Sequence, residues 1–161
     1  MAKVTLICGM LCSGKTTLAK RICEETGAIR LSCDELMLAL FPDDALGAEY
    51  ETYAARAKQY LLTRAEELCA AGVDVVLDWG FWTRAEREAT SRRFAARKIT
   101  VQWLRTTLDE DTWQQYIASR NLQVKSRLVK DYFVDDGLKS KALAHFEPLT
   151  DDELKLYATF S

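Results

Sequence analysis

Two glycines, a lysine and a hydroxyl residue near the N-terminus have the types and spacing of a phosphate-binding loop. Four residues separate Gly9 from Gly14, and Lys15 and Thr16 follow directly, which is the Walker A pattern. Glycines let backbone amides approach phosphate oxygens closely, and a helix N-terminus adds unpaired donors. The pattern predicts that Lys15 lies beside the β- and γ-phosphates of a nucleoside triphosphate and that Thr16 ligates Mg²⁺. The predicted nucleotide-binding residues are Gly9, Met10, Leu11, Cys12, Ser13, Gly14, Lys15, Thr16 and Thr17.

Two aspartates follow predicted strands, and the carboxyl ends of parallel strands are where ligands bind. Asp34 is predicted to lie in the first turn of a helix, where the helix dipole favours its ionised form. Such a carboxylate accepts protons weakly but orients a hydroxyl well, and orientation matters most in a loose phosphoryl-transfer transition state. Asp78 ends an apolar run in the layout of a Walker B aspartate, which predicts a contact with Mg²⁺ or with substrate. The alternative for each is a structural role at the start of the next helix.

The elements that would position these residues alternate short apolar runs with amphipathic helical patterns. This alternation predicts a three-layer α/β/α fold with a parallel sheet of about five strands, the first of them central. The expected strands are residues 4–8, 28–31, 73–78 and 100–104, with a fifth within 154–160. The expected helices are residues 15–25, 32–41, 50–71 and 83–98, one capped by Asp109 and one opened by a capping box of Thr150 and Glu153.

Composition narrows the class of protein. The 161 residues suit one domain with a sizeable core, and a net charge of −2 gives no global case for a nucleic-acid binder. Five scattered cysteines without a Cys-x-x-Cys pair argue against a disulfide framework or structural zinc, and one histidine excludes a His-rich metal site. No apolar run approaches the roughly 18 residues of a membrane span, and the N-terminus has no signal-peptide pattern. We therefore expect a cytoplasmic protein without membrane contact, a monomer or a weak homodimer.

Three segments together resemble a known group of proteins. They are the loop and helix from Gly9 to Ile22, the segment Leu31-Ser-Cys-Asp34-Glu35-Leu, and Val75-Val-Leu-Asp78-Trp-Gly-Phe-Trp-Thr-Arg84. The chain resembles the small P-loop kinases related to zeta toxins, polynucleotide kinases and chloramphenicol phosphotransferase, which carry an AAA-type ATP-binding domain. The resemblance covers most of the chain and implies a single P-loop kinase-like domain over residues 1–161. It also implies that Asp34 faces the acceptor hydroxyl.

The resemblance implies roles for basic side chains as well. Arg84 and Arg87 lie three residues apart on one predicted helical face, and arginines near this helix help the group bind acceptor or phosphate. The alternative is a solvated face paired with Glu86 and Glu88.

Residues 120–130 contain four basic residues and no acidic one, at the place where P-loop kinases have a mobile lid. Here the lid is expected at residues 120–135. Lid arginines bridge phosphates and neutralise the charge that develops during transfer. Arg120 matches the Arg-Asn position of the group and is predicted to be catalytic, and Arg127 is a predicted substrate contact. A basic surface helix is the alternative.

Two tryptophans follow Asp78. Trp79 and Trp82 either form the wall of an acceptor pocket or belong to the core.

Together these patterns predict that ATP and Mg²⁺ are used to move the γ-phosphate to a hydroxyl of a small-molecule acceptor. ATP is favoured over GTP because the guanine-reading Asn-Lys-x-Asp motif is absent from the sequence. The predicted catalytic residues are Lys15, Asp34 and Arg120; the predicted metal ligands are Thr16 and Asp78; the predicted substrate contacts are Asp34, Asp78, Trp79, Trp82, Arg84, Arg87 and Arg127. Three alternatives stay open: a polynucleotide 5′-kinase acting on nucleic acid, a zeta-toxin-like nucleotide-sugar kinase, and a non-catalytic ATP-binding switch module.

Overall fold

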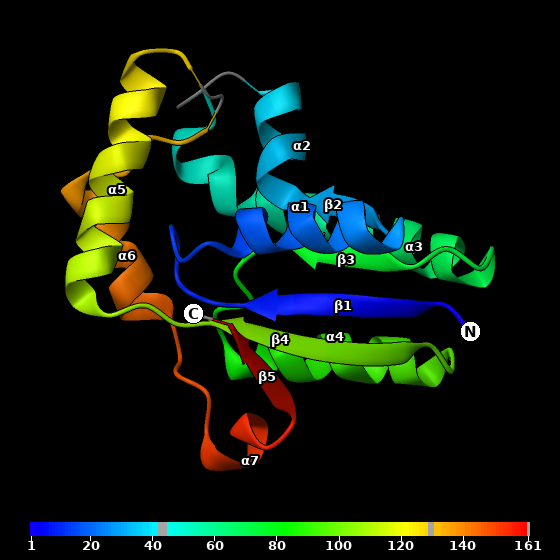
Figure 1. The fold of residues 1–161 in the computed structure, drawn as a ribbon. Coiled ribbons are helices and arrows are strands. Elements are labelled where there is room, and N and C mark those ends of the chain that lie inside the picture. Colours follow the sequence, from blue (N-terminus) through cyan, green and yellow to red (C-terminus); the bar gives the residue numbers. More distant parts are fainter. Residues whose placement is uncertain (42–44, 129–130, 161) are drawn as a thin grey trace.

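A five-stranded sheet, parallel throughout and ordered β2-β3-β1-β4-β5, forms the centre of the fold (Figure 1). The computed structural model describes residues 1–41, 45–128 and 131–160. The central strand is β1, as predicted, and its Val4, Leu6 and Ile7 are fully buried because helices cover both faces of the sheet. The strands are β1 (Lys3–Cys8), β2 (Ile29–Ser32), β3 (Val75–Asp78), β4 (Thr100–Thr106) and β5 (Tyr157–Phe160).

Helices pack on both faces of this sheet and complete the predicted three-layer architecture. One face carries Ile7 and packs against Leu18 and Ala19 of α1. The other face carries Leu6 and packs against a larger cluster that includes Met37 of α2, residues of α3, and Phe94 of α4. These helices are α1 (Lys15–Thr26), α2 (Cys33–Leu40), α3 (Tyr50–Ala70) and α4 (Arg84–Ala96), and a 3₁₀ turn (Gly47–Glu49) precedes α3.

The remaining helices are α5 (Glu110–Lys125), α6 (Asp136–His145) and α7 (Asp151–Leu154). Figure 1 shows α5 and α6 standing beyond the carboxyl ends of the strands, which is the edge where the sequence places its ligand-binding residues. The predicted cap of α5 is confirmed, because Asp109 accepts a hydrogen bond from the Thr112 amide at 2.8 Å. The capping box of Thr150 and Glu153 is confirmed at the start of α7.

The predicted elements are present, with ends that differ by one or two residues at several of them. β2 begins at Ile29 rather than residue 28, and β3 begins at Val75 rather than residue 73. The fifth strand is confirmed at residues 157–160. Helix α6 was not predicted, because its described residues bury Ala142 alone and so give little helical periodicity. Within the described residues, no helix combines the length and apolar character needed to cross a membrane.

Candidate active site

The phosphate-binding loop runs from the end of β1 into α1, and close contacts hold its shape. The Gly9 amide donates a hydrogen bond to the Gly80 carbonyl at 3.3 Å. A Cβ at Gly9 would lie 2.1 Å from Oγ1 of Thr106 and 2.7 Å from Oγ of Ser13, so this position accepts no side chain. Gly14 has a left-handed φ of 87° as the residue before α1. The hydroxyls of Ser13 and Thr106 are hydrogen-bonded at 2.6 Å, which ties the loop to β4.

The side chain of Lys15 contacts the backbone of this loop. Its Nζ donates a hydrogen bond to the Met10 carbonyl at 2.5 Å. Desolvation lowers the pKa of Lys15, and the nearby carboxylates of Asp78 and Asp34 act in the opposite direction. Thr16 is exposed at the start of α1, so its hydroxyl is open to a ligand. The loop therefore places a cation, a free hydroxyl and a helix N-terminus together, as phosphate binding requires.

A cavity of about 880 Å³ lies beside the loop and joins most of the predicted site residues. Its walls come from the phosphate-binding loop, α2, α3, the segment after β3, α4, α5, the segment before α6 and α6 itself. The predicted residues that line it are Leu11, Cys12, Ser13, Gly14, Lys15, Thr16, Thr17, Asp34, Asp78, Trp79, Trp82 and Arg120.

Asp34 lies in the first turn of α2, where Ser32 caps the helix by accepting from the Glu35 amide at 3.2 Å. Asp34 is exposed as a whole residue, but its carboxyl lies against the cavity wall and is partly desolvated there. Its pKa is raised, first by desolvation and then by the negative charge of Asp131. The helix dipole favours the ionised form of Asp34, whereas desolvation and Asp131 act in the opposite direction and raise its pKa. Asp34 is a better base than its helical position suggests.

Asp78 is buried at the end of β3 and has a partner that the sequence did not reveal. Nη1 of Arg30 lies 2.9 Å from Oδ2 of Asp78, and the same guanidinium also pairs with Glu35. The β2–β3 register brings these groups together by placing Ser32 opposite Asp78. Arg30 lies in a strand predicted from its apolar residues, and nothing in the local pattern points to a carboxylate 48 positions away.

The oxygen atoms available as metal ligands at the carboxyl ends of the strands fit Mg²⁺. In the part of the chain that the structure describes, no group of three or more His, Cys, Asp or Glu residues could hold a metal by itself. Mg²⁺ in kinases is bound by one or two protein oxygens together with phosphates and water, and it needs no larger cage. The exposed hydroxyl of Thr16 and the carboxylate of Asp78, which binds Arg30 through Oδ2, supply oxygen donors of this kind.

Arg120 faces the cavity from α5 rather than from a loop. Its Nε lies 3.3 Å from Oδ2 of Asp131. The next residue, Asn121, donates to the Val134 carbonyl and accepts from the Val134 amide, both at 2.7 Å. Asn121 therefore fixes the segment that carries Asp131 against α5, a role that the sequence analysis missed. A lid over residues 120–135 stays a prediction, and residues 129 and 130 lie outside the described part of the chain.

The two tryptophans after Asp78 pack against other residues of the protein and also line the cavity. Trp79 is 5% exposed and stacks on Phe81 with ring centroids 5.0 Å apart. Trp82 is half-buried, and both rings line the cavity. Gly80 and Phe81 separate them, and a Cβ at Gly80 would lie 2.1 Å from Nε1 of Trp82. The indole of Trp82 thus packs directly on the backbone of Gly80.

Three of the predicted arginines are not among the residues that line this cavity. Arg87 is 1% exposed and binds Glu153 together with the carbonyls of Phe81, Trp82 and Glu147, at 3.1 Å each. The prediction that it contacts substrate is corrected, because the side chain is buried and its guanidinium binds partners inside the protein. It holds the backbone that presents Trp82 instead.

Arg84 is partly exposed and pairs with Glu88 at 2.7 Å and Asp152 at 2.9 Å, which fits the alternative of a solvated helical face; its contact with substrate stays a prediction. Arg127 is exposed beyond the end of α5, with a left-handed φ of 55°. Its predicted contact with substrate is not supported by this arrangement.

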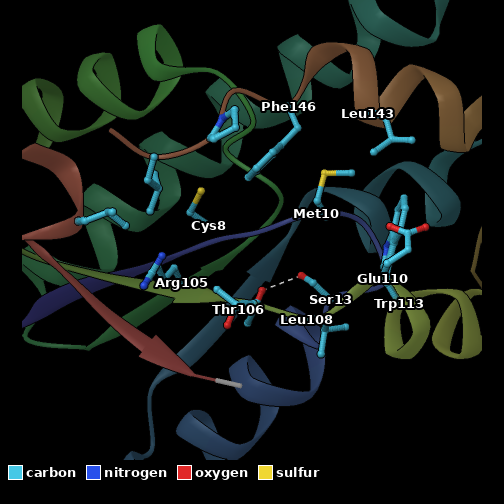
Figure 2. A pocket seen from close by; sticks show the side chains of 14 residues that line it. Cys8, Met10, Ser13, Arg105, Thr106, Leu108, Glu110, Trp113, Leu143 and Phe146 are labelled. Carbon is cyan, nitrogen blue, oxygen red and sulfur yellow. Dashed lines mark hydrogen bonds between the residues drawn. The ribbon is translucent and has the colours of Figure 1, made fainter. Parts of the chain in front are cut away.

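A second cavity, of about 350 Å³, lies behind the loop. Figure 2 shows Met10 and Ser13 of the loop on one side of it, with Leu143 and Phe146 across from Met10. The predicted loop residues thus contribute to both cavities, and Ser13 lines each of them. Met10 lines this second one, while Lys15 and Thr16 line the first.

Comparisons with known proteins agree with this architecture. Residues 4–140 match the family model described as AAA domain. No curated protein matches the sequence. A sugar kinase from Janibacter sp. HTCC2649 has a similar structure, with a TM-score of 0.67 and 17% identity over 99% of this chain and 84% of that chain.

Two further solved structures are also similar. Kti12 from Chaetomium thermophilum, in complex with ADP-AlF3, has a TM-score of 0.74 and 13% identity over 98% of this chain and 88% of that chain. A chain of the Pnkp1/Rnl/Hen1 RNA repair complex has a TM-score of 0.70 and 16% identity over 89% of this chain and 43% of that chain. At these identities the likeness concerns the fold. With the family match over residues 4–140, the chain belongs to the AAA domain family, as a small protein with the fold of P-loop kinases.

Proposed function

We propose that the protein transfers the γ-phosphate of ATP to a hydroxyl group of a small-molecule acceptor, with Mg²⁺ as cofactor. One observation carries the proposal: a single cavity contains the phosphate-binding residues Lys15 and Thr16 and, on another wall, the carboxylate of Asp34. Phosphoryl transfer needs donor and acceptor in line within one water-poor site, and the cavity offers a place for each.

The nucleotide half of the site is the loop and the start of α1. Lys15 would exchange its hydrogen bond to the Met10 carbonyl for β- and γ-phosphate oxygens. Thr16 and Asp78 would hold Mg²⁺, which when bound neutralises charge on the phosphates. Arg120 reaches the same cavity from α5, and its guanidinium suits the equatorial oxygens of the transferring group.

The acceptor half lies around Asp34. Its carboxylate would accept a hydrogen bond from the acceptor hydroxyl and orient the oxygen toward the γ-phosphorus. As the new O–P bond forms, the bond from the γ-phosphorus to the β,γ-bridging oxygen breaks, ADP leaves, and the hydroxyl proton passes to Asp34. The raised pKa of Asp34 favours that final transfer.

The test is mass spectrometry of a small-molecule extract incubated with ATP, Mg²⁺ and the purified protein, beside a Lys15→Ala control. A metabolite that gains one phosphoryl mass only with the unaltered protein is the expected result. Phosphorylation of oligonucleotides alone would move the function to a polynucleotide kinase, as in the alternative that the sequence left open. Lys15-dependent nucleotide binding with no transfer to either kind of acceptor would contradict the proposal and favour a switch module.

A further inference from the structure

We propose that the acceptor is an uncharged or cationic hydroxyl compound with an apolar face, and that the cavity rejects acceptors that already carry a phosphate. This inference rests on the proposed function, because it names the acceptor class of the same cavity. It follows from how the charged side chains on the cavity wall are paired and from which side chains lie between them.

The basic side chains on the acceptor side of the cavity are already held by carboxylates. Nζ of Lys58 lies 2.9 Å from Oε1 of Glu86, which connects α3 to α4. Lys141 of α6 pairs with Glu51 of α3. A phosphorylated acceptor would therefore have to displace a carboxylate from each lysine before it gained an ionic contact.

The two other cations on the cavity wall belong to the nucleotide side. Arg120 pairs with Asp131 at 3.3 Å, and Lys15 lies in the phosphate-binding loop. His145 also lines the cavity, with Nδ1 2.8 Å from the Lys141 carbonyl. Among the lining residues that the structure describes, every Lys or Arg is thus either paired with an acid or committed to the loop.

Carboxylates outnumber cations on this wall. The acidic residues that line it are Asp34, Glu51, Asp78, Glu86, Asp131 and Asp135, against the cations Lys15, Lys58, Arg120 and Lys141. Arg30, which does not line the cavity, neutralises the charge of Asp78. Asp135 caps α6 by accepting a hydrogen bond from the Leu138 amide at 2.7 Å. With Asp34 itself left out and Arg30 included, the carboxylates and the cations around Asp34 are equal in number, so the wall has no excess of positive charge that would attract a second anion to the reacting hydroxyl.

The surface between the paired charges is apolar and aromatic. Four aromatic residues line the same cavity as Asp34, from the segment after β3, the end of α2 and the start of α3: Trp79, Trp82, Phe41 and Tyr50. Such rings bind the apolar face of a ligand and attract a cation over their faces. They offer no ionic contact to a phosphate, so the acceptor is selected by shape, hydrogen bonding and the absence of negative charge.

The Lys58–Glu86 pair resists displacement more than the Lys141–Glu51 pair, whose side chains are 41% and 67% exposed. Lys58 and Glu86 are 32% and 24% exposed, so each would remain partly desolvated if the other were drawn away. Removing one partner of such a pair leaves an uncompensated charge, and this is the cost that an anionic acceptor would meet.

The experiment measures binding of two matched ligand pairs by isothermal titration calorimetry, with ADP and Mg²⁺ present to occupy the loop. The pairs are phenyl β-D-glucoside with its 6-phosphate, and thymidine with thymidine 5′-monophosphate. In each pair the two ligands share a hydroxyl and an apolar face and differ by one phosphate. We expect at least one parent compound to bind and its phosphate to bind roughly tenfold more weakly or worse. Equal or tighter binding of the phosphates, or no binding of any of the four, overturns the inference.

Two variants test the inference in the opposite direction, by releasing the lysines from their carboxylate partners. Glu86→Gln and Glu51→Gln free Lys58 and Lys141 with little change in side-chain shape. Each should shift the affinity ratio toward the phosphorylated ligand by roughly tenfold. Glu67→Gln is the matched control on α3, because Glu67 pairs with Arg64 and does not line the cavity, and it should leave the ratio unchanged. An unchanged ratio in both cavity variants, with thermal unfolding showing that they are folded, also overturns the inference.

Phosphoryl transfer to the same four ligands is measured separately with ATP, beside Lys15→Ala. Binding of the parent compounds without transfer would contradict the proposed kinase function and leave the acceptor class standing. Lys15-dependent transfer that prefers the phosphorylated ligands would support the proposed kinase function and overturn the inferred acceptor class.

Discussion

Arg87 and Glu153 form a bidentate ion pair between α4 and α7, with Nε 2.7 Å from Oε1 and Nη2 3.1 Å from Oε2. Their side chains are 1% and 9% exposed, and the residues lie 66 positions apart in the sequence. The same guanidinium binds the carbonyls of Phe81 and Trp82, so the pair also supports the wall of the cavity from behind. This pair is therefore a buried polar link between the C-terminal segment and the site.

Replacing Glu153 by glutamine should lower the free energy of unfolding by about 3–5 kcal/mol, because it leaves the buried charge of Arg87 without its counter-ion. Urea denaturation followed by circular dichroism measures the change. Asp152→Asn is the neighbouring control: Asp152 pairs with Arg84 on the surface, and its removal should change stability little. Equal losses in the two variants would show that burial of the Arg87 pair has no special importance.

The same pair predicts a pH dependence of stability. The hydrogen bonds from Arg87 lower the pKa of Glu153 from its ordinary value of 4.5. A carboxyl with a lowered folded-state pKa stabilises the fold above its unfolded pKa, and this contribution disappears as pH falls through the folded value. The stability difference between the unaltered protein and Glu153→Gln should therefore shrink on acidification below pH 4.5. A difference that stays constant over that range would contradict the assignment.

Asp34→Asn should reduce kcat by about 10²- to 10⁴-fold while ADP affinity stays unchanged, because the amide can orient a hydroxyl but cannot take its proton. Since the pKa of Asp34 is raised above 3.8, transfer by the unaltered protein should increase with pH through that raised value. The fall in transfer rate toward low pH should be absent from the Asp34→Asn variant. Asp111→Asn, in the first turn of α5, is the helix-matched control. Unaltered turnover in Asp34→Asn would remove this residue from the mechanism.

Gly9→Ala should abolish measurable ADP binding and lower the free energy of unfolding by about 1–3 kcal/mol, the usual cost of overpacking. The added Cβ would lie 2.1 Å from Oγ1 of Thr106 and would disturb the Ser13–Thr106 hydrogen bond that ties the loop to β4. Calorimetric titration with ADP measures the first effect. In Gly137→Ala the nearest contact is 3.3 Å, to Oδ1 of Asp135, and this variant should bind ADP normally.

Asn121→Ala should loosen the segment that carries Asp131, because it removes both hydrogen bonds to the Val134 backbone. Leaving these backbone groups unpaired costs about 1–3 kcal/mol. Hydrogen exchange should become faster at the Val134 amide, and kcat should fall more than ADP affinity because Asp131 no longer holds Arg120 in place. Asn121→Asp tests the two bonds separately, since the carboxylate keeps the acceptor and loses the donor. Unchanged exchange at Val134 in Asn121→Ala would show that other contacts hold this segment.

The local features of the fold could be predicted from the sequence because each is encoded within a few neighbouring residues. The Gly9–Thr16 spacing determined a loop between a buried strand and a helix, and the structure places it there. The caps at Asp109 and Thr150 followed from equally local patterns. A parallel sheet then brings strand ends to one edge, which is why Asp34, Asp78 and Lys15 line the same cavity.

Only the tertiary structure decided which charged side chains form ion pairs within the protein. Arg84 and Arg87 have the spacing of a ligand-binding helical face, yet α7 supplies carboxylates that occupy both. Arg30 looked like part of an apolar strand and instead binds Asp78.

The pKa of Asp34 likewise depends on cavity walls and on Asp131, which lies far along the chain. The physical reason is the same in each case. Helical periodicity, caps and loop motifs are short-range properties of the chain, whereas ion-pair partners and desolvation are set by segments that meet only when the helices pack against the sheet.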